Sequence, residues 1–528
     1  MNASDQDARF SRFLSTAALR RRDALGLLGL TIGGLGFPSW AQAQGTPKKG
    51  GVLKLAMPAN PSSLDPTTGG AGSDHPMLWP IYDTLVEWDY ATLAPKPGMA
   101  EWSFTDPTTL TLKLSPGIKF HDGTACDAEA VKWNLDRNRG DATSNLRADL
   151  ASIASIAVSG PGAVTLKLKQ PDAALPAIFS DRAGMMVSPS AQKAAGAGVN
   201  RKPVGAGPWK FVSWADNQKV VVTRNDGYWR PGLPYLDGIE FAIIPELATG
   251  LRSVISRQND MAYSISPLSR ALVEREKSLS LVTGPTLYCI QIYINYARKP
   301  LDNPKVRQAI NFALDRQAFV KVTMAGEGEP AYMNLPSTHW AYDSSVAGLY
   351  RHDPARAKAL LAEAGFPNGL ELTICGYTDQ DSVRRGEIVM AQLAQAGIRV
   401  KFSNGTIPEI SGQFFGNEKK FDLLLSAWTG RPDPSMTYSL MFAKDAYYNA
   451  GRGEFSSELS MLLQQSRAKE DMAYRKGVFA KIQRIVMENA LVAPLGFQFE
   501  LDAISKPVQG YKPDLLGKPK FNGVWLQR

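Results

Sequence analysis

Residues 421–435 read FDLLLSAWTGRPDPS, an apolar run followed at once by a loop that carries Trp428, Arg431 and Asp433. Residues 421–428 are nearly all apolar, which predicts a strand buried on both faces, as in a parallel sheet. Ligands of open parallel sheets bind beyond the carboxyl ends of the strands. We therefore expect the loop to lie at a cleft.

The side chains of this loop suit the binding of an anion. Arg431 offers a rigid fork of donors that fits a carboxylate or phosphate, and Trp428 offers an amphipathic wall. Gly430 and Pro432 restrict the backbone, which holds these groups in place. The alternative is that Arg431 pairs with Asp433 or a helix end as a structural ion pair, and that Trp428 is a core residue. Spacing alone leaves both interpretations open.

Helices and strands alternate around this stretch. Residues 303–314 and 353–365 each predict a helix with an N-cap followed by proline, the caps being Asn303 and Asp353. Strands are expected at 370–375, 398–402 and 421–428. Alternation of this kind predicts an α/β lobe with a largely parallel sheet.

The first half of the chain is richer in strands. Alternating apolar residues predict strands at 51–57, 109–114, 164–169, 219–225 and 238–246. Thr124 and Asp127 have the spacing of a capping box and predict the start of a helix. A chain of 528 residues exceeds what one core usually serves, so two or more lobes are expected.

Composition excludes several classes of protein. The chain is 44% hydrophobic and 21% charged, as in soluble globular proteins. The net charge is +9, but the densest basic group is 20–22, which does not support a nucleic-acid partner. The four histidines have no metal-ligand spacing, so we expect no metal and no cofactor.

The three cysteines, Cys126, Cys289 and Cys375, are far apart in the chain and form no metal or redox motif. Cys289 and Cys375 lie in apolar runs, which favours small buried side chains. One disulfide with one free thiol remains an alternative.

The N-terminus predicts an export signal at 1–43. Three arginines precede the short apolar, glycine-rich segment 24–37, and Ala-Gln-Ala follows at 41–43. The segment is shorter than the roughly 20 residues that span a bilayer. A twin arginine before such a segment resembles the twin-arginine signal, with ordinary Sec export as the alternative. We expect cleavage after about Ala43, no lipid anchor, and a periplasmic protein.

Several longer segments together resemble one known family. They are 81–89, 97–137, 203–214, 225–246, 300–328 and 353–374. In this order they resemble the dipeptide/oligopeptide/nickel group of ABC-transporter solute-binding proteins, family 5 of the extracellular solute-binding proteins.

The resemblance implies an α/β, two-lobed clamshell fold with mixed sheets and a large strand-rich first lobe. Lobe I would take 48–288 plus 497–528, and lobe II 289–496, with two crossover strands as the hinge. The resemblance implies that the protein is not an enzyme but a periplasmic receptor. This receptor would be a monomer that delivers a peptide-like or other small, carboxylated solute to an inner-membrane ABC permease. A secreted hydrolase is the rival, although its motifs G-x-S-x-G and H-E-x-x-H are missing from the sequence. A sensor or chaperone with the same fold also stays open.

The resemblance carries the binding residues over only in part. The dipeptide-binding branch places an aspartate directly after a W-T-G-like segment, where it receives the peptide's amino terminus. Arg431 stands there in this chain, which would repel an ammonium and favour an anionic group. Other ligand contacts are proposed from loop position and side-chain chemistry, with ordinary surface or packing roles as the alternative: Tyr438, Tyr263, Ser62 and Ser63.

Overall fold

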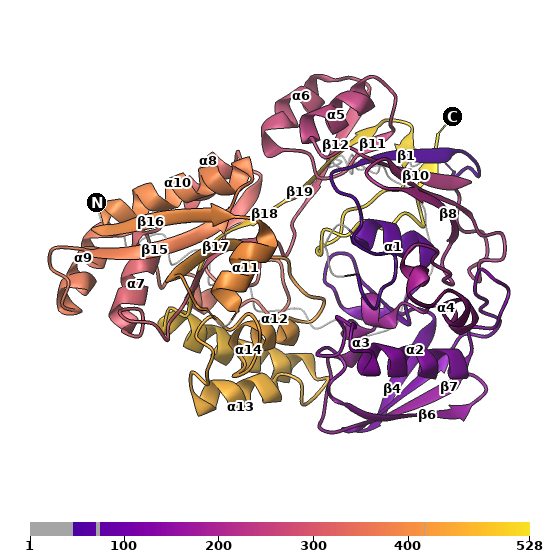
Figure 1. The fold of residues 1–528 in the computed structure, drawn as a ribbon, viewed down its shortest axis with the longest axis horizontal. Coiled ribbons are helices and arrows are strands. Elements are labelled where there is room, and N and C mark those ends of the chain that lie inside the picture. The colour runs from indigo at the N-terminus through magenta and orange to yellow at the C-terminus, as the bar shows by residue number, and fades with distance from the viewer. Residues whose placement is uncertain (1–45, 70–73, 417, 528) are drawn as a thin grey trace, which may run out of the picture. The chain divides into compact units, whose positions relative to one another are not determined.

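The computed structural model describes residues 46–69, 74–416 and 418–527, so the predicted signal at 1–43 lies outside the described residues. The described residues pack together as one unit. This unit has two lobes, each built around its own large sheet (Figure 1). The two-lobed α/β fold expected from the resemblance is therefore present.

The first lobe contains a seven-stranded sheet and a four-stranded sheet. The larger sheet has the order β12-β19-β11-β1-β10-β9-β8, and the smaller has the order β4-β5-β7-β6. The strands of the larger sheet are β1 (Val52–Met57), β8 (Trp209–Ala215), β9 (Lys219–Arg224), β10 (Gly238–Ile243), β11 (Met261–Ala262), β12 (Leu279–Gly284) and β19 (Glu500–Ser505). The smaller sheet has β4 (Ala100–Asp106), β5 (Thr109–Leu114), β6 (Ile153–Gly160) and β7 (Ala163–Leu168). Strand β5 occupies the residues that the sequence predicts.

Short helices and hairpins complete this lobe. Helix α2 packs on the four-stranded sheet, and α5 packs against the seven-stranded sheet. The helices are α1 (His75–Ile81), α2 (Ala128–Gly140), α3 (Leu175–Ile178), α4 (Pro189–Ala195), α5 (Leu247–Ile255) and α6 (Arg270–Arg275). The remaining strand pairs are β2 (Val86–Trp88) with β3 (Pro95–Pro97), and β20 (Val508–Gln509) with β21 (Trp525–Leu526).

The second lobe is built on a six-stranded sheet of the order β14-β18-β13-β17-β15-β16. Its strands are β13 (Cys289–Ile294), β14 (Gly328–Pro330), β15 (Leu370–Tyr377), β16 (Ile398–Gly405), β17 (Leu423–Trp428) and β18 (Val492–Gln498). Only the β15 pairs with β16 and β17 are parallel, whereas β13 runs antiparallel to both of its neighbours. The prediction of a largely parallel sheet is therefore wrong. The alternation of helix and strand along 303–428 does not predict how strands from outside this stretch, such as β13 and β18, pair with the sheet.

Helices cover this sheet and extend from it. They are α7 (Pro304–Ala313), α8 (Arg316–Thr323), α9 (Pro354–Glu363), α10 (Gln380–Gln395), α11 (Ile407–Phe415), α12 (Pro434–Phe442), α13 (Ser457–Gln465) and α14 (Met472–Glu488). The predicted caps Asn303 and Asp353 accept hydrogen bonds from backbone N–H groups of the first turn of α7 and α9. The predicted capping box is wrong: Asp127 caps α2, because the Thr124 hydroxyl donates to Asp122 instead.

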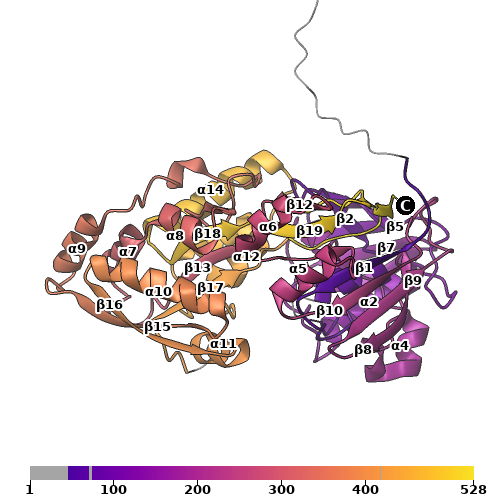
Figure 2. The same ribbon diagram turned by 90° about the horizontal axis from the view of Figure 1, so that it is seen from above.

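The chain crosses between the two large sheets at two places. It passes from β12 to β13, and it returns from β18 to β19 (Figure 2). The two crossings place β13, β17 and β18 beside one another at the centre of the second sheet, with the loop after β17 facing the first lobe.

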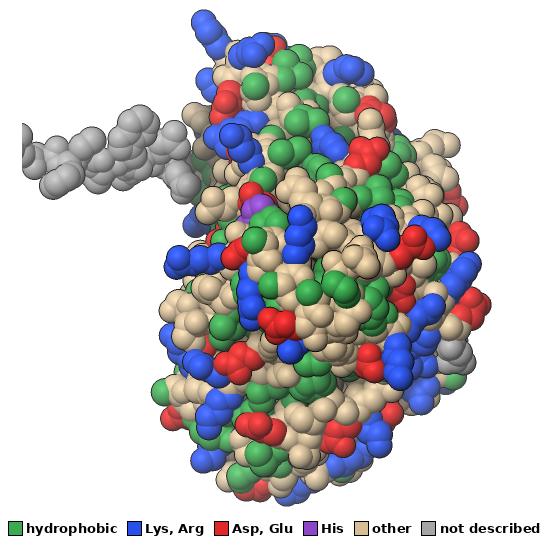
Figure 3. All heavy atoms as spheres, turned by 90° about the vertical axis from the view of Figure 1, so that its left-hand side faces the viewer, with side chains coloured by type: hydrophobic (Ala, Val, Ile, Leu, Met, Phe, Trp, Pro, Cys, Tyr) green, Lys and Arg blue, Asp and Glu red, His purple; other side chains and the backbone are tan. Residues whose placement is uncertain are grey.

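The three cysteines are buried and free. Burial raises the pKa of all three thiols, that of Cys375 to about 12, so each is a protonated packing residue. On the face shown in Figure 3, basic and acidic side chains are interspersed. Among the described residues, no helix has the length and apolar character needed to cross a membrane.

Candidate functional site

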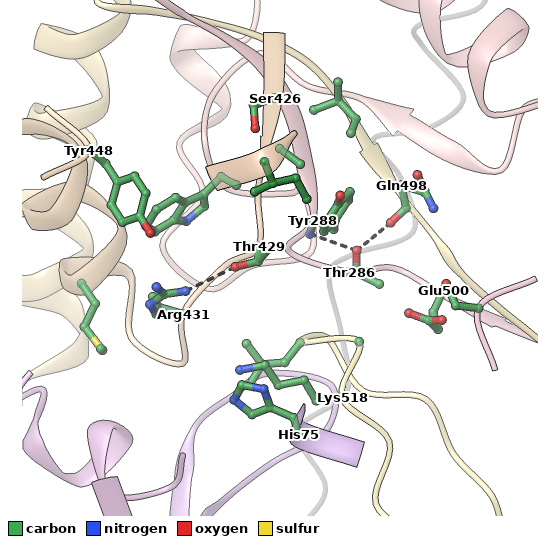
Figure 4. Close-up of a pocket in the computed structure, with 18 of the residues that line it drawn as sticks. His75, Thr286, Tyr288, Ser426, Thr429, Arg431, Tyr448, Gln498, Glu500 and Lys518 are labelled. Atoms are coloured by element: carbon green, nitrogen blue, oxygen red, sulfur yellow. Dashed lines mark hydrogen bonds between the residues drawn. The ribbon is translucent and has the colours of Figure 1, made fainter. Parts of the chain in front are cut away.

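A cavity of about 830 Å³ lies between residues of the two lobes. Sites for small molecules usually have volumes of roughly 300–1,000 Å³. One wall comes from the ends of β13 and β17 and from α11, and the opposite wall comes from α1, the loop after α3 and the C-terminal segment (Figure 4). Aromatic rings make up much of the lining: Tyr263, Tyr288, Tyr293, Tyr377, Phe415, Trp428, Tyr448 and Phe499.

Arg431 and Trp428 line this cavity together. The Arg431 guanidinium lies over the Trp428 ring, 5.0 Å from its centroid, and donates to the Gly430 carbonyl at 2.8 Å. Gly430 has φ +77°, and a Cβ there would lie 2.3 Å from the Leu287 side chain. Glycine is therefore needed at this turn. Among the described residues Arg431 makes no ion pair, so its charge is available to the cavity.

Two further cations from the other lobe approach Arg431. Arg182 and Lys518 both line the cavity. Burial lowers the pKa of Lys518, and the positive charges of Arg431 and Arg182 lower it further. Burial raises the pKa of Asp149, and the guanidinium groups of Arg431 and Arg182 offset part of that rise. Nη1 of Arg182 is buried and has no hydrogen-bond partner among the described residues. This side of the cavity is therefore cationic.

Lys518 is held by a small polar network. Its Nζ donates to Asp181 Oδ2 at 2.8 Å, and His75 Nε2 lies 3.1 Å from Asp181 Oδ1. Burial, together with the ammonium of Lys518, lowers the pKa of His75 to about 4, so the ring is neutral at pH 7. Burial would raise the pKa of Asp181, but Lys518 and His75 hold it well below its usual value. Asp181 thus neutralises Lys518. Among the described residues neither Arg431 nor Arg182 forms an ion pair, and Asp149 is a cavity acid whose charge interacts with both.

The sequence-predicted residues fall into two groups. Trp428, Arg431 and Tyr263 line the cavity, and the Tyr263 hydroxyl donates to the Gly517 carbonyl at 2.6 Å. Asp433 and Tyr438 do not line it. Asp433 caps α12 and forms a buried ion pair with Arg475, at 2.7 and 2.8 Å.

Tyr438, Ser62 and Ser63 have structural surroundings instead of the cavity. Tyr438 is fully buried and packs between the Phe442 and Phe479 rings. The Ser62 hydroxyl and backbone N–H both donate to the Asp74 carboxylate, at 2.7 and 2.6 Å. The Ser63 hydroxyl lies 2.9 Å from that of Thr68. We therefore leave these three residues and Asp433 out of the site.

Three residues that the sequence did not predict also line the cavity: Arg182, Lys518 and Glu500. None belongs to a recognisable motif, and Lys518 is 337 positions from its partner Asp181. One usable signal exists, because Asp181 and Arg182 interrupt the otherwise apolar run 174–187. Charged side chains in an apolar run are expected to have a polar or charged partner, because an unpaired buried charge is costly.

A second contact joins the lobes away from the crossings. Arg467, between α13 and α14, donates from Nε and Nη2 to both carboxylate oxygens of Asp172, each at 2.7 Å. The Ser152 hydroxyl donates to the same carboxylate at 2.6 Å, and the Ala173 N–H donates to the Arg467 carbonyl at 2.8 Å. Asp172 follows β7 of the first lobe, so this bidentate pair fastens one lobe to the other.

Comparison with known proteins identifies relatives over most of the chain. Residues 94–450 match the model of the bacterial extracellular solute-binding proteins, family 5 Middle. The glutathione-binding proteins GsiB of Shigella dysenteriae and of Escherichia coli K12 are each 31% identical over 477 residues, which cover 87% of this chain and 91% of the relative.

Solved structures share the fold. The periplasmic binding protein DppA of Helicobacter pylori, in complex with the peptide STSA, has a TM-score of 0.81 at 24% identity and covers 91% of this chain and 99% of its own. AgaA of A. tumefaciens R10, in complex with agropinic acid, has a TM-score of 0.79 at 23% identity, with coverages of 90% and 99%. At these identities the likeness shows the fold alone.

Proposed function

Because this chain belongs to family 5 of the bacterial extracellular solute-binding proteins, we propose that it binds a small peptide-like solute through a carboxylate of that solute. The chain is the solute-binding component of an ABC importer and not an enzyme. It works in the periplasm with an ABC permease, as the family does.

The observation that carries the proposal is a pair of cavity arginines that form no ion pair among the described residues. Arg431 comes from the loop after β17 in the second lobe, and Arg182 comes from the loop after α3 in the first. A carboxylate between them would satisfy the buried Nη1 of Arg182 and the free donors of Arg431. Because the two arginines belong to different lobes, one anion would favour the closed arrangement.

The relatives narrow the choice of solute. The GsiB proteins are named for glutathione, a peptide with two carboxylates. Glutathione is therefore the first solute that we propose for this chain. The cavity volume of about 830 Å³ is within the usual range for small-molecule sites and is large enough for glutathione.

Binding is expected to stabilise the protein. At a free glutathione concentration of ten times Kd, the free energy of unfolding should rise by about 1.4 kcal/mol. Thermal unfolding with glutathione, an opine and a sugar would measure this, and calorimetry would give each Kd. The sugar, which has no carboxylate, serves as the control. Stabilisation by the sugar and by neither carboxylated compound would contradict the proposal.

The ion pair between Asp172 and Arg467 should favour the closed arrangement. In the Asp172→Asn variant the charged pair is lost, so the free energy of closing the two lobes should become less favourable by roughly 1 kcal/mol. The apparent affinity for the solute should weaken about fivefold as a result. Small-angle scattering of the solute-free protein should report a larger radius of gyration. Lys132→Gln, which removes an ion pair within α2, is the control and should change neither quantity.

We also propose the finer assignments that follow from the family resemblance. Lobe I would take 48–288 plus 497–528 and lobe II 289–496, in agreement with the crossings at β12–β13 and β18–β19. The signal would be cleaved after about Ala43, with no lipid anchor, and the mature protein would be a monomer. Mass spectrometry and sedimentation of the exported protein test these assignments.

A further inference from the structure

A carboxyl group that no motif predicts lies in the cavity wall away from Arg431. Glu500 is the first residue of β19, and Figure 4 shows it on the opposite side of the cavity from Arg431. Its carboxyl packs on Gly517, where a Cβ would lie 2.9 Å from Oε2. Oε1 of Glu500 is buried and accepts no hydrogen bond from any donor among the described residues.

Of the other cavity carboxylates, Asp379 caps α10, Asp149 interacts with the charges of Arg431 and Arg182, and two have cationic partners. Asp181 binds Lys518, and Asp381 binds Arg384 at 3.0 Å. Glu500 differs, because among the described residues no lysine, arginine or histidine forms an ion pair with it. An acid that lines a ligand cavity and lacks a cation in the protein is suited to a cation in the ligand.

The groups around Glu500 are acids and phenols. Burial raises its pKa well above the usual value. The charges of Asp502 and Asp514 raise it further, as does a hydrogen bond between the carboxyl groups of Glu500 and Asp502. Asp502 accepts hydrogen bonds from the Tyr511 hydroxyl and the Ser264 N–H, at 2.6 and 2.8 Å. The Tyr263 hydroxyl, which also lies near Glu500, donates to Gly517. Burial and these acidic neighbours therefore favour the protonated form of Glu500 in the empty cavity.

We propose that Glu500 binds an ammonium group of the solute, so that the cavity takes a zwitterion with its cationic end at Glu500 and its carboxylate at Arg431. This inference rests on the proposed function, since Arg431 and Arg182 supply the anionic end. It names the solute class as peptides with a free amine, in an orientation set by one acid from β19 and one base from the loop after β17.

The binding step has a defined proton balance. Glu500 gives its proton to solvent when the ammonium arrives, and no other bond changes. Below the pKa of Glu500, affinity should rise with pH by up to about tenfold per unit, and it should level off once Glu500 is ionised in the empty cavity. Asp502 and Asp514, whose pKa values are raised by burial to about 6, are already largely ionised at pH 7.5 and should contribute little there.

The Glu500→Gln variant tests the inference, with glutathione and N-acetylglutathione as the probes. The variant keeps the shape of the side chain but cannot carry the negative charge. We expect glutathione to bind E500Q about tenfold more weakly than wild type, and N-acetylglutathione, which has no ammonium, to bind both proteins equally. Glu371→Gln, an exposed glutamate on β15, is the matched control and should bind both probes as wild type does. Thermal unfolding checks that each variant is folded.

Proton release gives a second readout. Calorimetry at pH 7 in two buffers of different ionisation enthalpy should show that wild type releases a proton when glutathione binds and that E500Q does not. Equal glutathione affinity in E500Q and wild type would overturn the inference, as would an equal loss for both probes. Wild type that prefers N-acetylglutathione would overturn it while leaving the carboxylate site at Arg431 intact. Failure of both probes to bind would overturn the inference and the proposed function together.

Discussion

The Arg431→Ala variant is expected to bind its carboxylated solute roughly 1.5–3 kcal/mol more weakly, or about 10- to 150-fold. Arg431 makes no ion pair among the described residues, and its contacts to Thr429 and Gly430 involve only Nη1. Arg431 lines the cavity, where a carboxylate would take two of its free donors. Truncation leaves the solute charge partly desolvated without a partner. Calorimetry with glutathione measures the change.

The control for this variant is Arg356→Ala. Arg356 is an exposed arginine on α9 that pairs with Glu363, away from the cavity. The Arg356→Ala variant should bind the solute with the same affinity as wild type. Unchanged affinity in the Arg431 variant would mean that the guanidinium serves only to cover the Trp428 ring, 5.0 Å away. A loss of affinity with unchanged thermal stability would favour a direct contact.

The Asp433→Asn variant is expected to lose roughly 3–5 kcal/mol of unfolding free energy. Asp433 is 4% exposed and Arg475 is 5% exposed, so the change leaves a buried guanidinium without its counter-ion. The side chain also caps α12 by accepting from the Ser435 N–H at 2.9 Å. Denaturant unfolding at pH 7 measures the loss, and the solute affinity of the folded fraction should stay close to wild type.

The pH dependence of this pair has a definite sign. Burial would raise the pKa of Asp433, but the charge and hydrogen bonds of Arg475 lower it below its usual value. The stabilisation is therefore present at neutral pH and is lost as the pH falls through the folded-state pKa. Asp216→Asn is the control, since its ion pair with Arg201 is exposed and should contribute nothing measurable. An Asp433 variant as stable as the control would contradict the structural role.

Local sequence was sufficient for many of the helices and strands and for the two residues of the 421–435 stretch that line the cavity, Trp428 and Arg431. Proline after a capping side chain fixed the starts of α7 and α9, because caps and φ restraints act within one turn. The apolar run at 421–428 became a strand whose following loop lies at the cavity. The position of Arg431 at the cavity could be predicted from the sequence, because the loop that carries Arg431 directly follows the end of this strand.

Tertiary structure decided which charges face the cavity and which are paired inside the protein. Arg431 and Asp433 are two positions apart, yet Asp433 is neutralised by Arg475 on a helix 42 positions later. Arg182 comes from the loop after α3, whereas Glu500 and Lys518 come from the C-terminal part of the chain. Only the folding of the first lobe and its packing on the second bring them to the cavity that Arg431 lines. The sequence around a residue shows only which residues are its neighbours along the chain. Its counter-ion, or the lack of one, depends on contacts with residues 42 positions away for Asp433 and 337 positions away for Asp181. For this protein that difference separates the structural charges from those left for a solute.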